Sequence, residues 1–445
     1  MKLSDLLSIV AVLGAAIAML LALKLYKRFA PSNPEWIRKL AHLSTGAFAI
    51  YFPWIFSSPV PVYLVCGLSV LLLASIRVVK PVSSRLSGVI NAVDRDSLGE
   101  FYFPISVAIL YGLAHRDKLL YIIPILVLTF ADAVGALLGT QYGRFGYHGM
   151  GAAKSLEGSV AFFTVAFLAV HVPLLLYTEM GRPQTLLVAA DIALIVTLLE
   201  AVAWHGLDNI LIPLGVFLLL HIYSDMPIEP LLFRLVAAVL LLIFVLLYRS
   251  RTTLEGSALL ASVLVLYASW ALGGWRWLLA PAVLFASYSL FFPGDLEEFE
   301  HKHNVYAVTS VAFAGLLWIF LAKVNSRPEL LFAYSVGYAV HLTMLGWTLI
   351  CAHCPKRSPW KAGPLLVAEC WLLIFVPYLL AQGFSVAFLG QAAIALAVCA
   401  AAFAAFCLIE PRHQGGYSVK PKRWIRQGSL ALLVSGAVAA AQELR

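Results

Sequence analysis

Apolar stretches long enough to cross a bilayer recur along the whole chain, and short polar segments separate them. A helix of about twenty apolar residues spans the hydrocarbon core of a membrane, so the pattern predicts membrane helices. We therefore expect an all-α fold, a polytopic transmembrane helical bundle of about 14–16 spans. The candidate spans are residues 5–23, 40–57, 60–76, 101–114, 119–139, 157–177, 184–203, 209–222, 231–248, 254–272, 275–291, 304–322, 329–350, 363–381, 384–408 and 428–441.

The composition agrees with a membrane environment. Of the 445 residues, 62% are hydrophobic and only 12% are charged, which is far too much apolar surface to hide in a soluble core. In the first apolar run the positive charges follow the apolar residues, so we interpret it as a retained helix and not a removable signal peptide. We expect the bilayer as a partner and no nucleic acid, and the oligomeric state stays open.

The positive charges predict the orientation of the spans. With the N-terminus outside, 22 of the 31 lysines and arginines fall in cytoplasmic loops. The four polar stretches that carry candidate chemistry fall on the same side, so we expect the catalytic loops in the cytoplasm. These stretches are residues 35–46, 91–104, 143–159 and 204–213.

Asp132 lies inside an apolar run, about seven residues or roughly 10 Å from the predicted end of its helix. An ionised aspartate in mid-membrane costs about 2.5–3.5 kcal/mol, so such a residue is functional by default. Its carboxylate is suited to hold Mg²⁺ or to activate a lipid hydroxyl, and a purely structural role is the alternative. His42, also inside a predicted span, is a second candidate for the site.

A glycine-rich loop follows this helix. Gly139 and Gly143 continue a spacing of four from Gly135, which suits either substrate contact or close helix packing. Lys154 then supplies a positive charge, and glycines before it leave backbone N–H groups open to an anion. We therefore predict phosphate binding in this loop.

The next predicted helix begins directly after Lys154. Hydroxyls and backbone N–H groups at a helix N-terminus favour phosphate, and Ser155, Gly158 and Ser159 occupy that position. Glu157 is suited either to hold a metal ion or to cap the helix.

Three further polar segments supply matching groups. Arg38 and Lys39 precede the second span, where they serve either a phosphate or the orientation of the helix. Asp96 lies in an acidic loop beside the next span, which suits metal-bridged phosphates or a simple solvated loop. Asp208 and Asn209 form a short polar break that is either part of the site or a helix cap.

Five motifs, in this order and spacing, resemble those of the dolichol kinase/phytol kinase family of membrane lipid kinases, which is similar in turn to the phosphatidate cytidylyltransferases. The motifs are "RKLAHLSTG", "DSLGEFYFP", "ADAVGALLGTQYGRFG", "KSLEGSVAFF" and "GLDNILIPL". The resemblance covers about residues 30–250. The cytidylyltransferases carry a longer Ser-Pro-Lys-Lys type run where this chain has "GAAKSLEGS", and this departure favours a kinase.

The resemblance implies transfer of a phosphoryl group from a nucleoside triphosphate, typically CTP, to the hydroxyl of an isoprenoid alcohol such as phytol, a polyprenol or dolichol. It implies functional positions at Arg38, Lys39, Asp132, Gly139, Lys154 and Glu157. Phosphoryl transfer requires neutralised phosphates and an aligned hydroxyl, so we expect the cations to clamp phosphates. We expect Asp132, Asp96 and Glu157 to act in catalysis and to hold Mg²⁺.

The signals also divide the chain. We expect residues 1–250 to form a lipid-kinase-like catalytic membrane domain and residues 251–445 an accessory transmembrane domain of unknown role. In the second part, the basic segment 410–427 is expected to be a loop against anionic lipid headgroups. Two other functions stay open, namely synthesis of a CDP-lipid and transport without nucleotide turnover.

Overall fold

The computed structural model describes residues 3–29, 34–78, 98–114, 117–148, 153–203, 205–248, 256–291, 305–353, 358–410 and 421–443. Within these ranges helices dominate, and ten of them are long and apolar enough to cross a membrane. Four shorter apolar helices accompany them. The all-α, multi-pass prediction is confirmed, whereas the side of the membrane on which the N-terminus lies stays a prediction.

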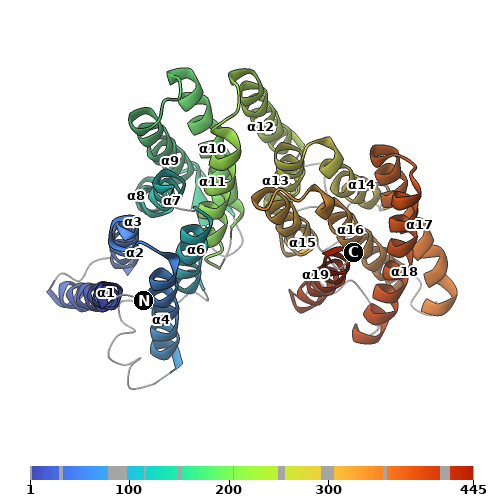
Figure 1. The fold of residues 1–445 in the computed structure, drawn as a ribbon, viewed down its shortest axis with the longest axis horizontal. Coiled ribbons are helices and arrows are strands. Elements are labelled where there is room, and N and C mark those ends of the chain that lie inside the picture. The colour runs from blue at the N-terminus through green and yellow to red at the C-terminus, as the bar shows by residue number, and fades with distance from the viewer. Residues whose placement is uncertain are drawn as a thin grey trace. The chain divides into compact units, whose positions relative to one another are not determined.

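The chain forms two compact units, residues 1–240 and residues 241–445 (Figure 1). The boundary falls inside α12 (Ile228–Tyr248), ten residues before the division at 250 that the sequence suggested. The assignment of catalysis to the first part and of an accessory role to the second stays a prediction.

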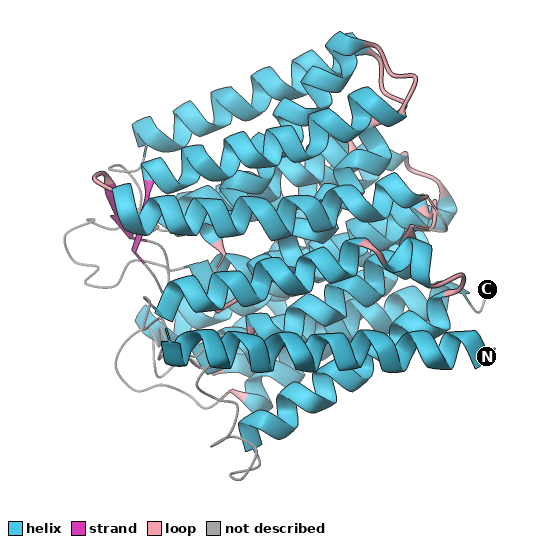
Figure 2. Cartoon of the chain, turned by 90° about the vertical axis from the view of Figure 1, so that its left-hand side faces the viewer, coloured by secondary structure: helices cyan, strands magenta, loops and turns pink. Residues whose placement is uncertain are grey.

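The helices of the first unit follow the expected spans closely, and Figure 2 shows them running alongside one another. They are α1 (Leu3–Phe29), α2 (Pro34–Ile50), α3 (Phe52–Ile55), α4 (Pro59–Val78), α6 (Gly99–Leu113), α7 (Lys118–Leu126), the π-helical η1 (Val127–Ala131), α8 (Asp132–Tyr142), α9 (Leu156–Tyr177), α10 (Arg182–Val202), α11 (Asp208–Tyr223) and α12.

Helices α7, η1 and α8 form one continuous span at the centre of this unit. The span is surrounded by α2, α9 and α11, all of which pack against it. Ile123, Ile125, Val127 and Ala131 are completely buried along it. Because α2 comes from the start of the chain, this packing brings the "RKLAHLSTG" segment against the helix that carries Asp132.

Helices α8 and α9 approach each other through glycines. A Cβ atom on Gly158 would lie 2.9 Å from the Gly135 carbonyl oxygen and 3.1 Å from the Gly139 Cα. A Cβ atom on Gly139 would in turn lie 3.2 Å from the Ser155 hydroxyl. The glycine spacing therefore serves close helix packing, which was one of its two expected roles.

The glycine-rich segment after α8 is not simply a loop. β1 (Gly146–His148) and β2 (Ala153–Ser155) pair antiparallel, with Tyr147 opposite Lys154. The Leu156 N–H donates to the Phe145 carbonyl at 3.0 Å and continues the pairing to the start of α9. The hairpin fixes the position of Lys154 relative to both flanking helices. Gly149 and Gly151 lie outside the described residues.

The second unit contains α13 (Gly256–Gly273), α14 (Trp275–Phe291), α15 (Val305–Val324), the 3₁₀ turn η2 (Pro328–Leu330), α16 (Leu331–His353), α17 (Pro359–Gln382), α18 (Val386–Ile409) and α19 (Pro421–Glu443). Helix α16 is central, because it packs against α14, α15, α17, α18 and α19. Inside this unit the Tyr334 hydroxyl donates to the Trp277 carbonyl at 2.6 Å.

The prediction of a basic loop at 410–427 was partly wrong. Helix α19 begins at Pro421, seven residues before the predicted span, and Arg423 and Trp424 are each only 3% exposed. Proline is well tolerated in the first turn of a helix, and the tryptophan that follows packs inward. Arg426 pairs with Glu410 at 3.1 Å and neutralises part of the remaining charge.

The glycine contact between α8 and α9 makes a stability prediction. Gly158→Ala places a methyl group against backbone atoms that cannot yield, so we expect a loss of about 1–3 kcal/mol in unfolding free energy. The matched control is Gly67→Ala in α4, where no described atom lies within 4 Å of the new methyl group. Unfolding in detergent measures both variants, and equal stability of the two would contradict the close approach.

Candidate active site

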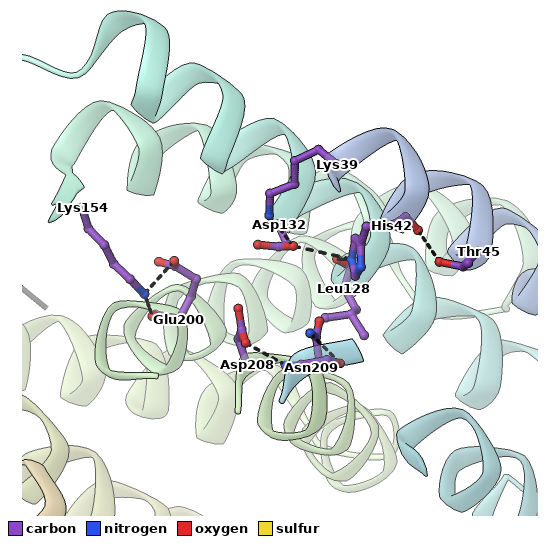
Figure 3. Close-up of polar contacts among 10 residues, drawn as sticks. Lys39, His42, Thr45, Leu128, Asp132, Lys154, Glu200, Asp208 and Asn209 are labelled. Atoms are coloured by element: carbon purple, nitrogen blue, oxygen red, sulfur yellow. Dashed lines mark hydrogen bonds and ion pairs between the residues drawn. The ribbon is translucent and has the colours of Figure 1, made fainter. Parts of the chain in front are cut away.

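Helix α2 and the α7–α8 span meet at a buried ion pair. The Lys39 ammonium donates to Asp132 Oδ2 at 2.7 Å, with the two side chains 2% and 12% exposed (Figure 3). Helix α2 begins at Pro34, six residues before the predicted span, so Lys39 lies within a helix and not at its end. It faces the protein interior and does not act as a surface anchor.

His42 lies one turn further along α2 and joins the same carboxylate. Its Nε2 is 3.5 Å from Asp132 Oδ2 and 3.2 Å from the Leu128 carbonyl oxygen. A carbonyl oxygen only accepts hydrogen bonds, so Nε2 carries the proton in this arrangement. The ring of Phe103 meets the imidazole edge-on at 5.6 Å and fixes its orientation.

The π turn η1 positions these groups. A π turn holds an i→i+5 backbone pattern and occurs frequently at functional sites. Here it ends directly before Asp132, and its Leu128 carbonyl is the one that faces His42. Gly46 in α2 packs directly against Thr129 of the same turn. Any side chain at position 46 would collide with that threonine, so the close approach requires glycine.

Lys154 is held at the end of α10. Its ammonium pairs with Glu200 Oε1 at 2.8 Å and also contacts the Glu200 main-chain carbonyl, while both side chains are 18% exposed. The carbonyl groups at a helix C-terminus attract cations, so the end of α10 stabilises the Lys154 ammonium.

Glu200 links the parts of the site, and the sequence reasoning missed it. Asp132 and Asp208 both act electrostatically on its carboxylate, and Figure 3 shows the three side chains in one region. Its signal was available, because Glu200 is an acid inside an apolar run, as Asp132 is. Asp191 carries the same signal in α10 and is completely buried.

The start of α9 is organised locally. The Ser155 hydroxyl caps the helix by accepting from the Gly158 N–H at 3.2 Å. Glu157 Oε1 accepts from the backbone N–H groups of Arg144 and Phe145 at 3.0 and 3.3 Å. Glu157 therefore fastens the segment directly before β1 to the start of α9.

The other residues predicted for this region lie close by. Ser159 lies in the first turn of α9. A Cβ atom on Gly143 would lie 2.8 Å from Ser155 Oγ, so this glycine closes against the capping serine.

Two motifs far apart in sequence meet at the start of α11. The Asn209 side-chain amide donates to the Gly99 carbonyl at 3.1 Å, and the Leu98 N–H donates to the His205 carbonyl at 3.0 Å. Asp208 is the first residue of α11, and its Oδ1 accepts from the Asn209 backbone N–H at 3.1 Å. The turn is tight, with positive φ angles at His205 and Gly206.

The structure thus joins Lys39, His42 and Asp132 directly, and Arg38 acts electrostatically on Asp132. Asp96 lies outside the described residues. Within the described part of the chain, no three His, Cys, Asp or Glu side chains are grouped as a metal site. Of the described residues, Lys39 and His42 both contact Asp132 Oδ2, which leaves Oδ1 as a hard oxygen donor suited to Mg²⁺.

Comparison with known proteins decides the family. No protein family model matches the chain, and no solved structure matches it. A phytol kinase from Synechocystis sp. is 30% identical to it over 200 residues, which make up 44% of this chain and 83% of that protein. The chain belongs to the phytol kinase family. The resemblance seen in the five motifs is confirmed.

Membership of the phytol kinase family makes the chain a phosphotransferase with an alcohol as acceptor. The expectation of a membrane lipid kinase is confirmed at this level. The matched relative accounts for less than half of this phytol kinase family member, so the comparison does not cover the whole chain.

The buried Lys39–Asp132 pair makes a prediction that needs no assay of activity. Removing one charge strands the other in an apolar interior, so Lys39→Met or Asp132→Asn alone should each lower the unfolding free energy by about 3–5 kcal/mol. The double variant strands no charge and should recover most of that loss. Unfolding in detergent measures the cycle, and additive losses would show that the two residues do not interact.

Proposed function

We propose that this protein transfers the γ-phosphoryl group of CTP to the hydroxyl of an isoprenoid alcohol of the phytol or polyprenol type. The observation that carries the proposal is the buried group Lys39, His42 and Asp132 within a membrane-spanning bundle. A position inside a membrane-spanning bundle suits an acceptor that arrives from the bilayer, as a lipid alcohol does. The name of the Synechocystis relative supports both the reaction and the class of acceptor.

Asp132 is the proposed centre of the reaction. Its Oδ2 is held by Lys39 and His42, so the carboxylate has a fixed orientation. Its Oδ1 would then accept the hydrogen bond of the lipid hydroxyl or hold Mg²⁺. Fixing the acceptor in line with the transferring group is the main contribution a protein makes to phosphoryl transfer.

Positive side chains serve the triphosphate. Lys154 and Arg38 come from different segments of the first unit, and Lys39 lies at the carboxylate that Arg38 also influences. Together these cations offset the charge that builds up on the transferring phosphoryl oxygens. The α9 N-terminus, which contains Ser155, Gly158 and Ser159, is a favourable position for an anion.

Mg²⁺ bound to the nucleotide would neutralise phosphate charge. Asp132 would supply one oxygen ligand, and in such sites substrate phosphates and water supply most of the others. We propose the cytoplasmic side for the hairpin, where the nucleotide is found, and an external N-terminus.

The reaction is tested with membranes that contain the protein, labelled CTP and a panel of lipid alcohols. We expect free CDP and a lipid monophosphate that depend on Mg²⁺. Pyrophosphate and a CDP-lipid would instead identify a cytidylyltransferase, and no nucleotide turnover with any acceptor would favour transport.

The catalytic role of Asp132 is tested in the same assay. Asp132→Asn should abolish turnover, because the amide cannot accept a proton or hold a metal ion as the carboxylate does. The double variant Lys39→Met/Asp132→Asn controls for stability, since it should be folded and yet inactive. Near-normal activity in folded Asp132→Asn would remove this residue from the mechanism.

The phosphate clamp makes a separate prediction. Lys154→Ala and Arg38→Ala should each reduce kcat/KM for CTP by an amount equivalent to about 2–4 kcal/mol, the scale for losing one well-placed donor. A matched control is Lys361→Ala, an exposed lysine near the start of α17. Unchanged specificity constants in both site variants would rule out the clamp.

A further inference from the structure

Glu200 lies near the end of α10 and forms an ion pair with Lys154, in the region of Asp132 and Asp208 (Figure 3). Its carboxylate holds the Lys154 ammonium at 2.8 Å, and its main-chain carbonyl contacts the same ammonium. Lys154 thus makes two contacts with one residue, near the C-terminal end of α10, where the helix dipole favours a cation. A free lysine side chain samples many rotamers, and this double contact confines it to one region.

The position of the pair connects it with the rest of the site. Glu200 interacts electrostatically with Asp132 and with Asp208, and Figure 3 shows the Lys154–Glu200 pair in the same region as both carboxylates. Lys154 reaches this point from the hairpin, whereas Glu200 belongs to α10. The ion pair therefore joins the glycine-rich segment to the helical scaffold.

We propose that Glu200 is a positioning residue, which holds the Lys154 ammonium where the transferring phosphoryl group of the nucleotide develops its charge. The inference rests on the proposed function. It gives Glu200 no direct contact with substrate, because the residue acts through Lys154.

Two effects of removing the carboxylate oppose each other when the nucleotide first binds. Loss of a negative charge favours a triphosphate, and loss of the fixed ammonium disfavours it. In the transition state only the second effect is large, since the charge on the phosphoryl oxygens must meet a donor already in place. Glu200→Gln should therefore reduce kcat at least tenfold and change the KM for CTP by less than threefold.

A double-variant cycle separates positioning from a direct role. In the Lys154→Ala background Glu200→Gln should reduce kcat less than twofold, because the residue through which it acts is gone. Glu200→Asp keeps the charge and should restore most of the lost kcat. Additive losses, or a wild-type kcat in Glu200→Gln, would overturn the proposal.

The matched control is Glu329→Gln. Glu329 also forms a short ion pair, with Arg327 at 2.7 Å, but it belongs to the second unit. It should leave kcat and both KM values within twofold of wild type. A tenfold fall in kcat in this control would show that loss of any such pair damages the enzyme, and it would overturn the specific role of Glu200.

A second measurement does not depend on turnover. Acylation of lysines by an amine-directed reagent, read by mass spectrometry, should modify Lys154 at least fivefold faster in Glu200→Gln than in wild type, with exposed Lys361 as the internal reference. Equal rates would overturn the positioning role even in an active kinase. If wild type showed no lipid phosphorylation while Lys154 became reactive in the variant, the proposed function would fail and the positioning of Lys154 would stand.

Discussion

The buried ion pair between Lys39 and Asp132 is the interaction on which the rest of this site depends. A lone charge of either sign would be expensive in the interior of a membrane bundle, so each residue requires the other. The pair couples α2 to the central α7–α8 span, and that coupling sets where His42, Arg38 and the Leu128 carbonyl lie. The ion pair therefore determines both the packing of α2 and the positions of the polar groups of the site.

Most of the helices could be predicted from the sequence, because long apolar runs allow one structure in lipid. The prediction placed α14 at 275–291 and the structure has Trp275–Phe291. The ends of helices were harder where charged residues begin a helix. Both α2 and α19 start with proline, and each carries a buried basic residue in its first two turns, namely Lys39 and Arg423. Hydropathy alone treats such residues as loop.

Individual site residues were also readable, but their partners were not. An aspartate in an apolar run identifies Asp132 without a structure, yet nothing in the sequence states that Lys39 pairs with it across 93 positions. Glu157 was expected to hold a metal or to cap a helix, and this role stays a prediction; its contacts with the backbone N–H groups of Arg144 and Phe145 needed the structure. The role of Glu200 could be recognised only in the structure, because it depends on the ion pair with Lys154.

The π turn at Val127–Ala131 has a consequence for anyone who draws this span as a helical wheel. One extra residue in a turn rotates everything beyond it by about 100° relative to a regular α-helix. A wheel built from the sequence would therefore place Asp132 on the wrong side with respect to Ile123 and Ile125. Regular α-helical geometry through this turn, with all its residues kept, would swing the carboxylate away from α2, although every side chain of the site would still be present.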